Sequence, residues 1–305
     1  MSGPFADAQL EEWVKRASAG GGGLDVGAMR EGIAQRSRLR PRGPEMHEVR
    51  ELRVDALPAR LYRPVAAPGP LVVYLHGGGW TIGGLESHDR ACRNLAAGSG
   101  AQLLAVDYRL APEHPWPASV DDAVSAVCWV AERPSELELD GPVAVAGDSA
   151  GGTLAALACL RVRDEHPDAL PDLQVLICPN TDLAGSYPSM QEKAVGWGMD
   201  AEAVRFFNSQ WVADEREWSS PGVSPLHAPD LRGLPPALIV TAEHDVLRDE
   251  GEAYAERLRQ AGVTVHLRRE PGLVHNFPML DQISPACADA TERLMADLRV
   301  RLSPG

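Results

Sequence analysis

The feature that most constrains the fold is the recurrence of short, continuous and largely apolar runs between residues 71 and 267, with helix-like segments between most of them. A run that is apolar at every position suits a strand buried on both faces, because a strand with one solvated face alternates in polarity. Such strands, alternating with helices, indicate an α/β protein with a largely parallel sheet flanked by helices. The runs are Leu71–Leu75, Gln102–Val106, Val143–Ala146, Leu173–Cys178, Ala237–Thr241 and Val263–Leu267, and the helices are expected near His88–Ala97, Ala118–Ala131, Ala150–Asp164, Asp249–Ala261 and Ser284–Leu302.

Three segments lie outside this alternation. A short N-terminal helix is expected before Gly20–Gly23, which is interpreted as a flexible joint. Arg50–Asp55 and Ala59–Tyr62 alternate in polarity around a turn at Ala56–Pro58, which indicates an antiparallel pair at a sheet edge. The interval from residue 184 to residue 225 carries large apolar side chains that either pack this segment onto the body or form an apolar wall over a pocket. These side chains are Met190, Trp197, Met199, Phe206, Phe207, Trp211 and Trp218.

Length and charge limit the classes of function. A chain of 305 residues, with 44% hydrophobic and 24% charged residues, suits one α/β domain with an appended lid. The net charge of −14 offers no field to hold a nucleic acid or an anionic membrane surface. No run approaches the roughly 20 apolar residues that span a bilayer. The acidic start, MSGPFADAQLEEW, lacks the features of a secretory signal, so a cytoplasmic enzyme is expected.

The cysteines point to packing rather than to metal binding. They are odd in number, widely spaced and mostly flanked by small apolar residues, with neither a CxxC motif nor close Cys/His pairing. Disulfides and metal sites need such pairings, so we expect reduced core thiols and no metal ion. The residues concerned are Cys92, Cys128, Cys159, Cys178 and Cys287.

The candidate nucleophile lies in the string Gly147-Asp148-Ser149-Ala150-Gly151, which follows a strand-like run and precedes a helix-like one. In that context small residues let strand and helix approach, and a strained turn presents the serine hydroxyl at the sheet edge. The same string without a strand before it and a helix after it would be an ordinary glycine-rich turn. Ser149 is therefore the expected nucleophile, and Asp148 is interpreted as an orienting or structural group.

A serine hydroxyl needs a base, and the base needs an acid to fix its tautomer. The string resembles the nucleophile turn of the α/β-hydrolases, and that resemblance implies that the acid and then the histidine follow the nucleophile in the chain. His275 lies in the loop Pro271–Pro278 beyond an expected strand end, whereas His266 lies within the strand. Asp245 ends the run ALIVTAEHD, so its carboxylate lies just past a strand. The lesser candidates for the acid are Glu243 and Asp249.

The third element is His76-Gly77-Gly78-Gly79, directly after the run ending at Leu75. Attack on an acyl carbon places negative charge on oxygen, and glycines let backbone N–H groups approach that oxygen. We expect the N–H groups of Gly77, Gly78 and Ala150 to form an oxyanion hole, with His76 fixing the loop.

Four motifs together resemble the hormone-sensitive-lipase-like branch of the α/β-hydrolases. They are HGGGW at 76–80, DYRLAPEHPWPA at 107–118, GDSAGG at 147–152 and HDVLRDEG at 244–251, and the match runs from about residue 45 to the C-terminus. The resemblance implies an α/β-hydrolase fold with Ser149, Asp245 and His275 as the triad. It also implies a helical cap made of residues 1–45 and about 184–222, with 46–305 forming the catalytic domain that carries this insertion. Within the second motif, Asp107 and Arg109 are expected to support the glycine loop electrostatically.

The implied activity is that of a serine carboxylesterase acting on short- to medium-chain esters of small molecules, without a cofactor. A deacetylase, lactonase or amide hydrolase acting on a dedicated metabolite would use the same triad. A non-catalytic small-molecule receptor is the other alternative, but the gibberellin receptors, which resemble this branch, lack the catalytic histidine that His275 supplies here. Members of the branch often form dimers, so a homodimer stays open. The branch usually has His-Gly-Phe after the base and Phe or Tyr after HGGG, whereas Asn276 and Trp80 occupy those positions here. These departures concern the substrate and not the reaction class.

Overall fold

The computed structural model describes residues 4–19 and 23–303, and it confirms the predicted α/β architecture with a largely parallel sheet flanked by helices. An eight-stranded sheet has the order β1-β2-β4-β3-β5-β6-β7-β8. β2 pairs antiparallel with β1 and β4, and every other pair is parallel. The strands are β1 Glu48–Val54, β2 Leu57–Arg63, β3 Gly69–Leu75, β4 Gln102–Val106, β5 Leu139–Asp148, β6 Leu173–Ile177, β7 Ala237–His244 and β8 Val265–Val274.

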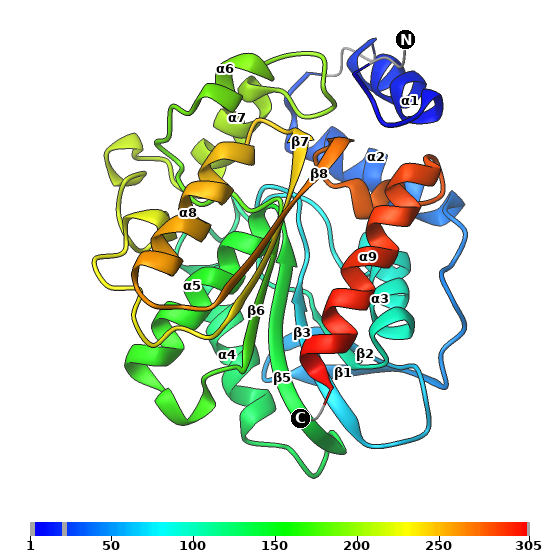
Figure 1. Ribbon diagram of the computed structural model, residues 1–305, viewed down its shortest axis with the longest axis vertical. Coiled ribbons are helices and arrows are strands. Elements are labelled where there is room, and N and C mark those ends of the chain that lie inside the picture. Colours follow the sequence, from blue (N-terminus) through cyan, green and yellow to red (C-terminus); the bar gives the residue numbers. More distant parts are fainter. Residues whose placement is uncertain (1–3, 20–22, 304–305) are drawn as a thin grey trace.

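Helices cover both faces of the sheet (Figure 1), with α4, α5 and α8 on one face and α3 and α9 on the other. α1, α2, α6 and α7 gather at one end of the sheet. The α-helices are α1 Ala8–Ala19, α2 Val26–Leu39, α3 Leu85–Ser99, α4 Ala118–Ala131, α5 Ala150–Glu165, α6 Pro188–Glu192, α7 Ala201–Trp211, α8 Arg248–Gln260 and α9 Pro285–Leu302.

The continuous apolar runs fold as expected because both faces of the central strands are covered. In β3, Leu71, Val73 and Leu75 pack with the helices on the α4/α5/α8 face, while Val72 and Tyr74 pack with those on the α3/α9 face. Successive side chains of a strand point to opposite faces, so each residue of such a run reaches one of two cores.

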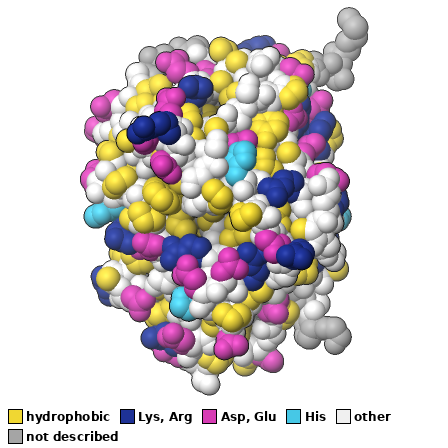
Figure 2. Space-filling model, turned by 90° about the vertical axis from the view of Figure 1, so that its left-hand side faces the viewer, with side chains coloured by type: hydrophobic (Ala, Val, Ile, Leu, Met, Phe, Trp, Pro, Cys, Tyr) yellow, Lys and Arg dark blue, Asp and Glu magenta, His cyan; other side chains and the backbone are white. Residues whose placement is uncertain are grey.

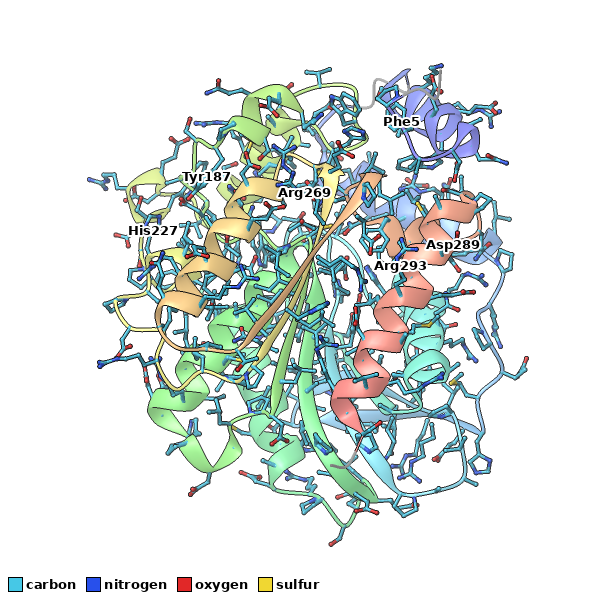
Figure 3. All side chains as sticks on the ribbon, viewed as in Figure 1. Phe5, Tyr187, His227, Arg269, Asp289 and Arg293 are labelled. Carbon is cyan, nitrogen blue, oxygen red and sulfur yellow. The ribbon has the colours of Figure 1, made fainter. Side chains whose placement is uncertain are left out.

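Two boundaries differ from the sequence prediction. The turn between β1 and β2 is shorter than predicted, because Val54 pairs with Leu57 and only Asp55 and Ala56 connect the strands. β8 is longer than the run that indicated it and ends at Val274. Its middle is polar because ion pairs satisfy it at the sheet edge: Arg293 of α9, labelled in Figure 3, lies 2.6 Å from Glu270. The joint predicted at Gly20–Gly23 lies mostly outside the described residues.

Three features that the sequence bears on are the distribution of charge, the apolar character of the helices and the burial of the cysteines. Acidic and basic side chains are interspersed over the face shown in Figure 2, so the negative charge is spread there rather than gathered. In the described part of the chain, no helix is both long and apolar enough to cross a membrane. Four of the cysteines are buried, as expected for core thiols, and Cys128 is half-buried.

Candidate active site

Ser149 occupies a strained turn between β5 and α5. Its backbone has φ 53° and ψ −122°, a left-handed region that side chains other than glycine rarely adopt. The flanking glycines make the turn sterically feasible: a Cβ on Gly151 would come within 1.9 Å of the Leu75 carbonyl oxygen, and one on Gly147 within 2.7 Å. The chain therefore packs β5 and α5 tightly and leaves the serine hydroxyl at the carboxyl end of the sheet.

His275 and Asp245 meet Ser149 at this end of the sheet. Asp245 follows β7 directly, and His275 follows β8. His275 Nε2 lies 2.9 Å from Ser149 Oγ, and His275 Nδ1 lies 2.8 Å from Asp245 Oδ2. The Leu247 N–H donates to the other carboxylate oxygen of Asp245 at 2.9 Å, which fixes its orientation. The structure thus brings together the three residues that the sequence analysis expected to form a triad.

The alternative acids and base lie elsewhere. Glu243 accepts a hydrogen bond from the Gly272 N–H at 2.7 Å, and Asp249 accepts one from the Ser189 N–H at 2.8 Å. His266 is half-exposed on β8 and faces Asp297 at 3.9 Å. These contacts hold strands and helices together and do not reach Ser149.

The environment of His275 suits a base that is oriented by an anion. Burial alone would lower the pKa of His275, but the charge and the hydrogen bond of Asp245 outweigh it. The pKa of His275 is therefore raised above its ordinary value of 6.5. An imidazole with this partner accepts a proton more readily than a free one.

The glycine loop differs from the prediction in one donor. The Gly77 N–H, expected in the oxyanion hole, donates to Asp148 Oδ1 at 2.9 Å and is not available to a substrate. Among the described residues, none accepts a hydrogen bond from the N–H groups of Gly78 or Gly79. The donors that remain free beside Ser149 are therefore Gly78 and Gly79, together with Ala150 at the N-terminus of α5.

Asp148 holds this loop as an ionised group. Burial alone would raise the pKa of Asp148, but His88 and the hydrogen bond from the Tyr74 hydroxyl outweigh it and lower the pKa to about 2. A carboxylate in this state gives the Gly77 N–H a charge-assisted bond. Burial and the neighbouring His88 lower the pKa of His76 to about 3, so that ring is neutral.

The support predicted from the 107–118 motif is in part wrong. Arg109 makes an ion pair with Asp122 of α4 at 2.6 Å, away from the glycine loop. The contact to the loop comes from Tyr108, whose hydroxyl donates to the His76 carbonyl oxygen at 2.7 Å. The motif therefore reaches the loop by a hydrogen bond and not through the Arg109 charge.

The backbone conformation of Asn276 shows why asparagine can replace the glycine that usually follows the base in this family. Asn276 has φ 56° and ψ 36°, the left-handed conformation. Glycine adopts it without strain, and asparagine is among the side chains that tolerate it best. Asn276 thus preserves the backbone path that positions His275 and adds a side chain to the wall of the site.

A pocket of about 270 Å³ opens onto Ser149 and His275. Its walls come from the glycine loop, from α2, from α7 and from the η4 turn, Phe277–Leu280. The N-terminal segment and the 184–222 segment meet beside it: a Cβ on Gly198 would lie 3.2 Å from the Trp13 ring of α1, and the ring centroids of Phe5, which precedes α1, and Trp197 lie 5.1 Å apart. Figure 3 shows Phe5 at the end of the molecule where α1 lies.

Both interpretations of the large apolar residues in the interval 184–225 hold. Trp211 stacks on Trp80 with ring centroids 4.1 Å apart, and Trp218 is buried in the same core. Phe207 and Met199 instead line the pocket, and the Phe207 ring is so close to Gly79 that a Cβ there would come within 2.2 Å of it. Some side chains of this segment thus pack it onto the body, and others form the wall of the pocket.

The sequence analysis placed residues 1–45 in the cap but did not predict the helix α2 within them or its place in the pocket wall. This helix buries no residue fully, so its hydrophobic pattern is weak. Two signals were present: Asp25 caps the helix by accepting from the Ala28 N–H at 2.7 Å, and three pocket-lining residues recur at helical spacing, with a fourth at the C-cap. They are Ile33, Arg36, Ser37 and Arg40.

One group of metal-donor side chains occurs among the described residues, namely Cys178, Asp245 and His275, all within 4.8 Å. Asp245 and His275 already hydrogen-bond each other there, and His275 uses its second nitrogen toward Ser149. A metal ion held by all three side chains would have to displace one of these two contacts of His275. The arrangement therefore fits proton transfer better than metal binding.

The family model described as alpha/beta hydrolase fold matches residues 72–279. The carboxylic ester hydrolase LipN of Mycobacterium tuberculosis is 42% identical over 273 residues, which cover 86% of this chain and 73% of LipN. Ethyl acetate hydrolase of Pseudomonas putida is 40% identical over 232 residues, covering 74% and 73%. A solved esterase of the archaeon Pyrobaculum calidifontis has a TM-score of 0.89 at 36% identity, covering 96% and 98%. The chain therefore belongs to the α/β-hydrolase fold family, in its hormone-sensitive-lipase-like branch.

Proposed function

We propose that this chain is a serine carboxylesterase that hydrolyses esters of small molecules through an acyl-enzyme intermediate, with Ser149, His275 and Asp245 as its catalytic triad. The observation that carries the proposal is the continuous chain Ser149 Oγ, His275, Asp245, with contacts of 2.9 and 2.8 Å, at the wall of a pocket. Relatives that cover most of the chain are named carboxylic ester hydrolases and esterases.

The geometry supports the following sequence of steps. Ser149 Oγ attacks the acyl carbon while its proton passes to His275 Nε2, and Asp245 stabilises the resulting imidazolium. The C–O bond to the alcohol breaks, and the alcohol leaves with that proton. Water then gives a proton to His275 and attacks the same carbon. The acid leaves as Ser149 regains its proton.

The oxyanion donors in this proposal are the N–H groups of Gly78, Gly79 and Ala150. Each belongs to a residue that lines the pocket beside Ser149. The Ala150 N–H also lies at the positive end of the α5 dipole. Removing a single donor of this kind typically costs about 100- to 1,000-fold in kcat. The hydrogen bond from Gly77 to Asp148 keeps the other two glycines in place.

We infer that residues 1–45 and about 184–222 form a two-part cap over this site. Support comes from the pocket wall, which takes α2 from the first part and α7 from the second. The pocket volume of about 270 Å³ lies just below the roughly 300–1,000 Å³ of ordinary ligand sites. A pocket of this size favours short acyl groups over the chains of a triglyceride.

A panel of p-nitrophenyl esters from C2 to C16 tests the proposed function. We expect kcat/KM to be highest between about C2 and C8 and to fall for longer chains, because the pocket holds little more than a small ligand. The rate should not jump when a substrate passes its solubility limit. Phe207→Ala should move the preference to longer chains, since this ring lies against Gly79 in the pocket.

Phe206→Ala is the matched control, because Phe206 neighbours Phe207 on α7 and does not line the pocket. Faster hydrolysis of long-chain emulsions than of dissolved short esters would overturn the proposed preference, and an equal shift in both variants would remove Phe207 from the acyl site.

The pH dependence of kcat/KM follows from the environment of His275. The imidazole must be neutral to accept the serine proton, so kcat/KM rises as His275 is deprotonated. Because Asp245 raises the pKa of His275 above 6.5, the rising limb is expected above pH 6.5. In Asp245→Asn the residual limb should move to lower pH, since the charge that raised the pKa of His275 is gone. A flat profile with chemistry rate-limiting is incompatible with His275 as the base.

A further inference from the structure

The pocket wall carries an unusual distribution of charge for this chain. Although the net charge is −14, no Asp or Glu occurs among the described residues that line the pocket, whereas Arg36 and Arg40 do. Arg36 lies on the face of α2 that also presents Ile33 and Ser37, and Arg40 is the residue at the C-cap of the same helix. The pocket therefore faces its ligand with positive charge inside a negatively charged protein.

Neither arginine is used to hold the fold in the way that Arg30 is. Arg30, on the same helix, donates to Glu113, to the Ala111 carbonyl and to the Thr81 carbonyl, with contacts between 2.7 and 2.9 Å. Within the described residues, the Arg36 guanidinium makes no ion pair or hydrogen bond, and Arg40 donates only to the Ser87 carbonyl at 3.2 Å. α2 is thus anchored by Arg30, and the other two keep free donors.

The acidic groups near Arg40 are occupied by other partners. Asp281 accepts from the Arg90 Nε at 2.9 Å and from Asn94 at 2.9 Å, and it pairs with the Arg90 Nη2 at 2.8 Å. Burial lowers the pKa of Arg40; Asp281 compensates in part, and Arg90 and Arg36 lower it further. Glu31, on α2, accepts from Gln35. Among the described residues, no carboxylate makes an ion pair with Arg36 or Arg40.

We propose that Arg36 and Arg40 form an anion subsite, and that the preferred substrates are small esters carrying a carboxylate or phosphate away from the scissile bond. The inference rests on the proposed esterase function and names its substrate class. The planar guanidinium group can donate two parallel hydrogen bonds to a carboxylate or to a phosphate. An arginine that is already half-buried and has no carboxylate partner loses less hydration on binding such an anion than a fully hydrated cation does. Arg36 is exposed and Arg40 is half-buried, so the subsite lies where the pocket meets solvent.

Two pairs of esters test the subsite and show which part of the substrate it binds. Monoethyl succinate carries a carboxylate on the acyl part and is compared with its neutral isostere, ethyl 4-methylpentanoate. The 4-acetoxybutanoate anion carries it on the alcohol part and is compared with 4-methylpentyl acetate. Each hydrolysis releases acid, so kcat and KM come from proton release at constant pH. The readout is the ratio of kcat/KM for the anionic ester to that for its neutral partner.

In Arg40→Gln and in the double variant with Arg36→Gln, this ratio should fall at least about tenfold in one of the two pairs, through KM, as expected for a lost hydrogen bond to a charged group. Raising the salt concentration to about 0.5 M should lower the wild-type ratio as well, because it screens the attraction. Arg38→Gln is the matched control: it removes the same charge from the same helix, and Arg38 does not line the pocket. The pair that responds assigns the subsite to the acyl or to the alcohol side.

A ratio that stays within about twofold of wild type in both pairs overturns the subsite, as does an equal fall in Arg38→Gln. These results differ from failure of the proposed function, in which wild-type enzyme hydrolyses none of the four esters, neutral ones included. A thermal melt of each variant confirms that the substitutions leave the fold intact.

Discussion

Replacing Ser149 with alanine is expected to lower kcat for ester hydrolysis by about a million-fold, because the members of a triad act as a unit and the attacking atom itself is lost. The fold should survive: the strained turn is set by Gly147, Gly151 and the backbone bond from the Ser149 N–H to the Ile177 carbonyl at 2.8 Å, which alanine retains. Steady-state hydrolysis of p-nitrophenyl acetate, with a thermal melt of the same sample, gives both quantities.

The kcat of His275→Ala should fall as far as that of Ser149→Ala, and His266→Ala provides the control. Both histidines follow Ser149 in the chain, but His266 is half-exposed on β8 and has no contact with the site. Activity of Ser149→Ala within about tenfold of wild type would reject Ser149 as the nucleophile. A large loss in His266→Ala with little loss in His275→Ala would reverse the assignment of the base.

Asp245→Asn is expected to reduce kcat by up to roughly ten-thousand-fold, because an amide in place of the carboxylate favours the wrong tautomer of the base. The contact at stake is the 2.8 Å hydrogen bond that the His275 Nδ1–H donates to Asp245 Oδ2. The Leu247 N–H still has an oxygen to bind, so the loop after β7 should keep its shape. The effect therefore belongs to chemistry and should appear in kcat more than in KM.

Asp249→Asn is the matched comparison, four residues further along the chain. Asp249 accepts from the Ser189 N–H and pairs with Arg248, which ties α8 to α6. Its loss should cost some stability and little activity, as judged by the melting temperature and kcat. If Asp249→Asn were the more damaging of the two, the acid would not be the residue at the end of β7.

The central fold could be predicted from the sequence because its signals are local. Strands such as β3 and β6 are apolar at nearly every position, and the glycines on either side of Ser149 mark the turn in the sequence. Asp245 and His275 could be placed at strand ends because parallel strands finish at one edge of the sheet. The length of β8 was underestimated because its polar residues are typical of a loop. They fit a strand here because Arg293 of α9 pairs with Glu270.

The parts that could not be predicted depend on partners distant in the chain. The orientation of the Gly77 N–H is set by Asp148, 71 positions away, so three adjacent glycines gave no indication of which ones face the substrate. Arg109 was expected to support the glycine loop electrostatically, but α4 brings Asp122, 13 positions along the chain, into an ion pair with it. Arg36 and Arg40 were not recognised because α2 becomes a pocket wall only once Arg30 has docked it on Glu113.

The most direct test of the central claim is covalent labelling with an active-site phosphonate ester, followed by peptide mass spectrometry. The account predicts that one phosphonyl group per chain is attached to Ser149, that activity is lost in proportion to labelling, and that Ser149→Ala takes up no label. Asp245→Asn should be labelled much more slowly at neutral pH, because its base is in the wrong tautomer. Stoichiometric labelling of a different residue, or full activity after Ser149 has been labelled, would contradict the account.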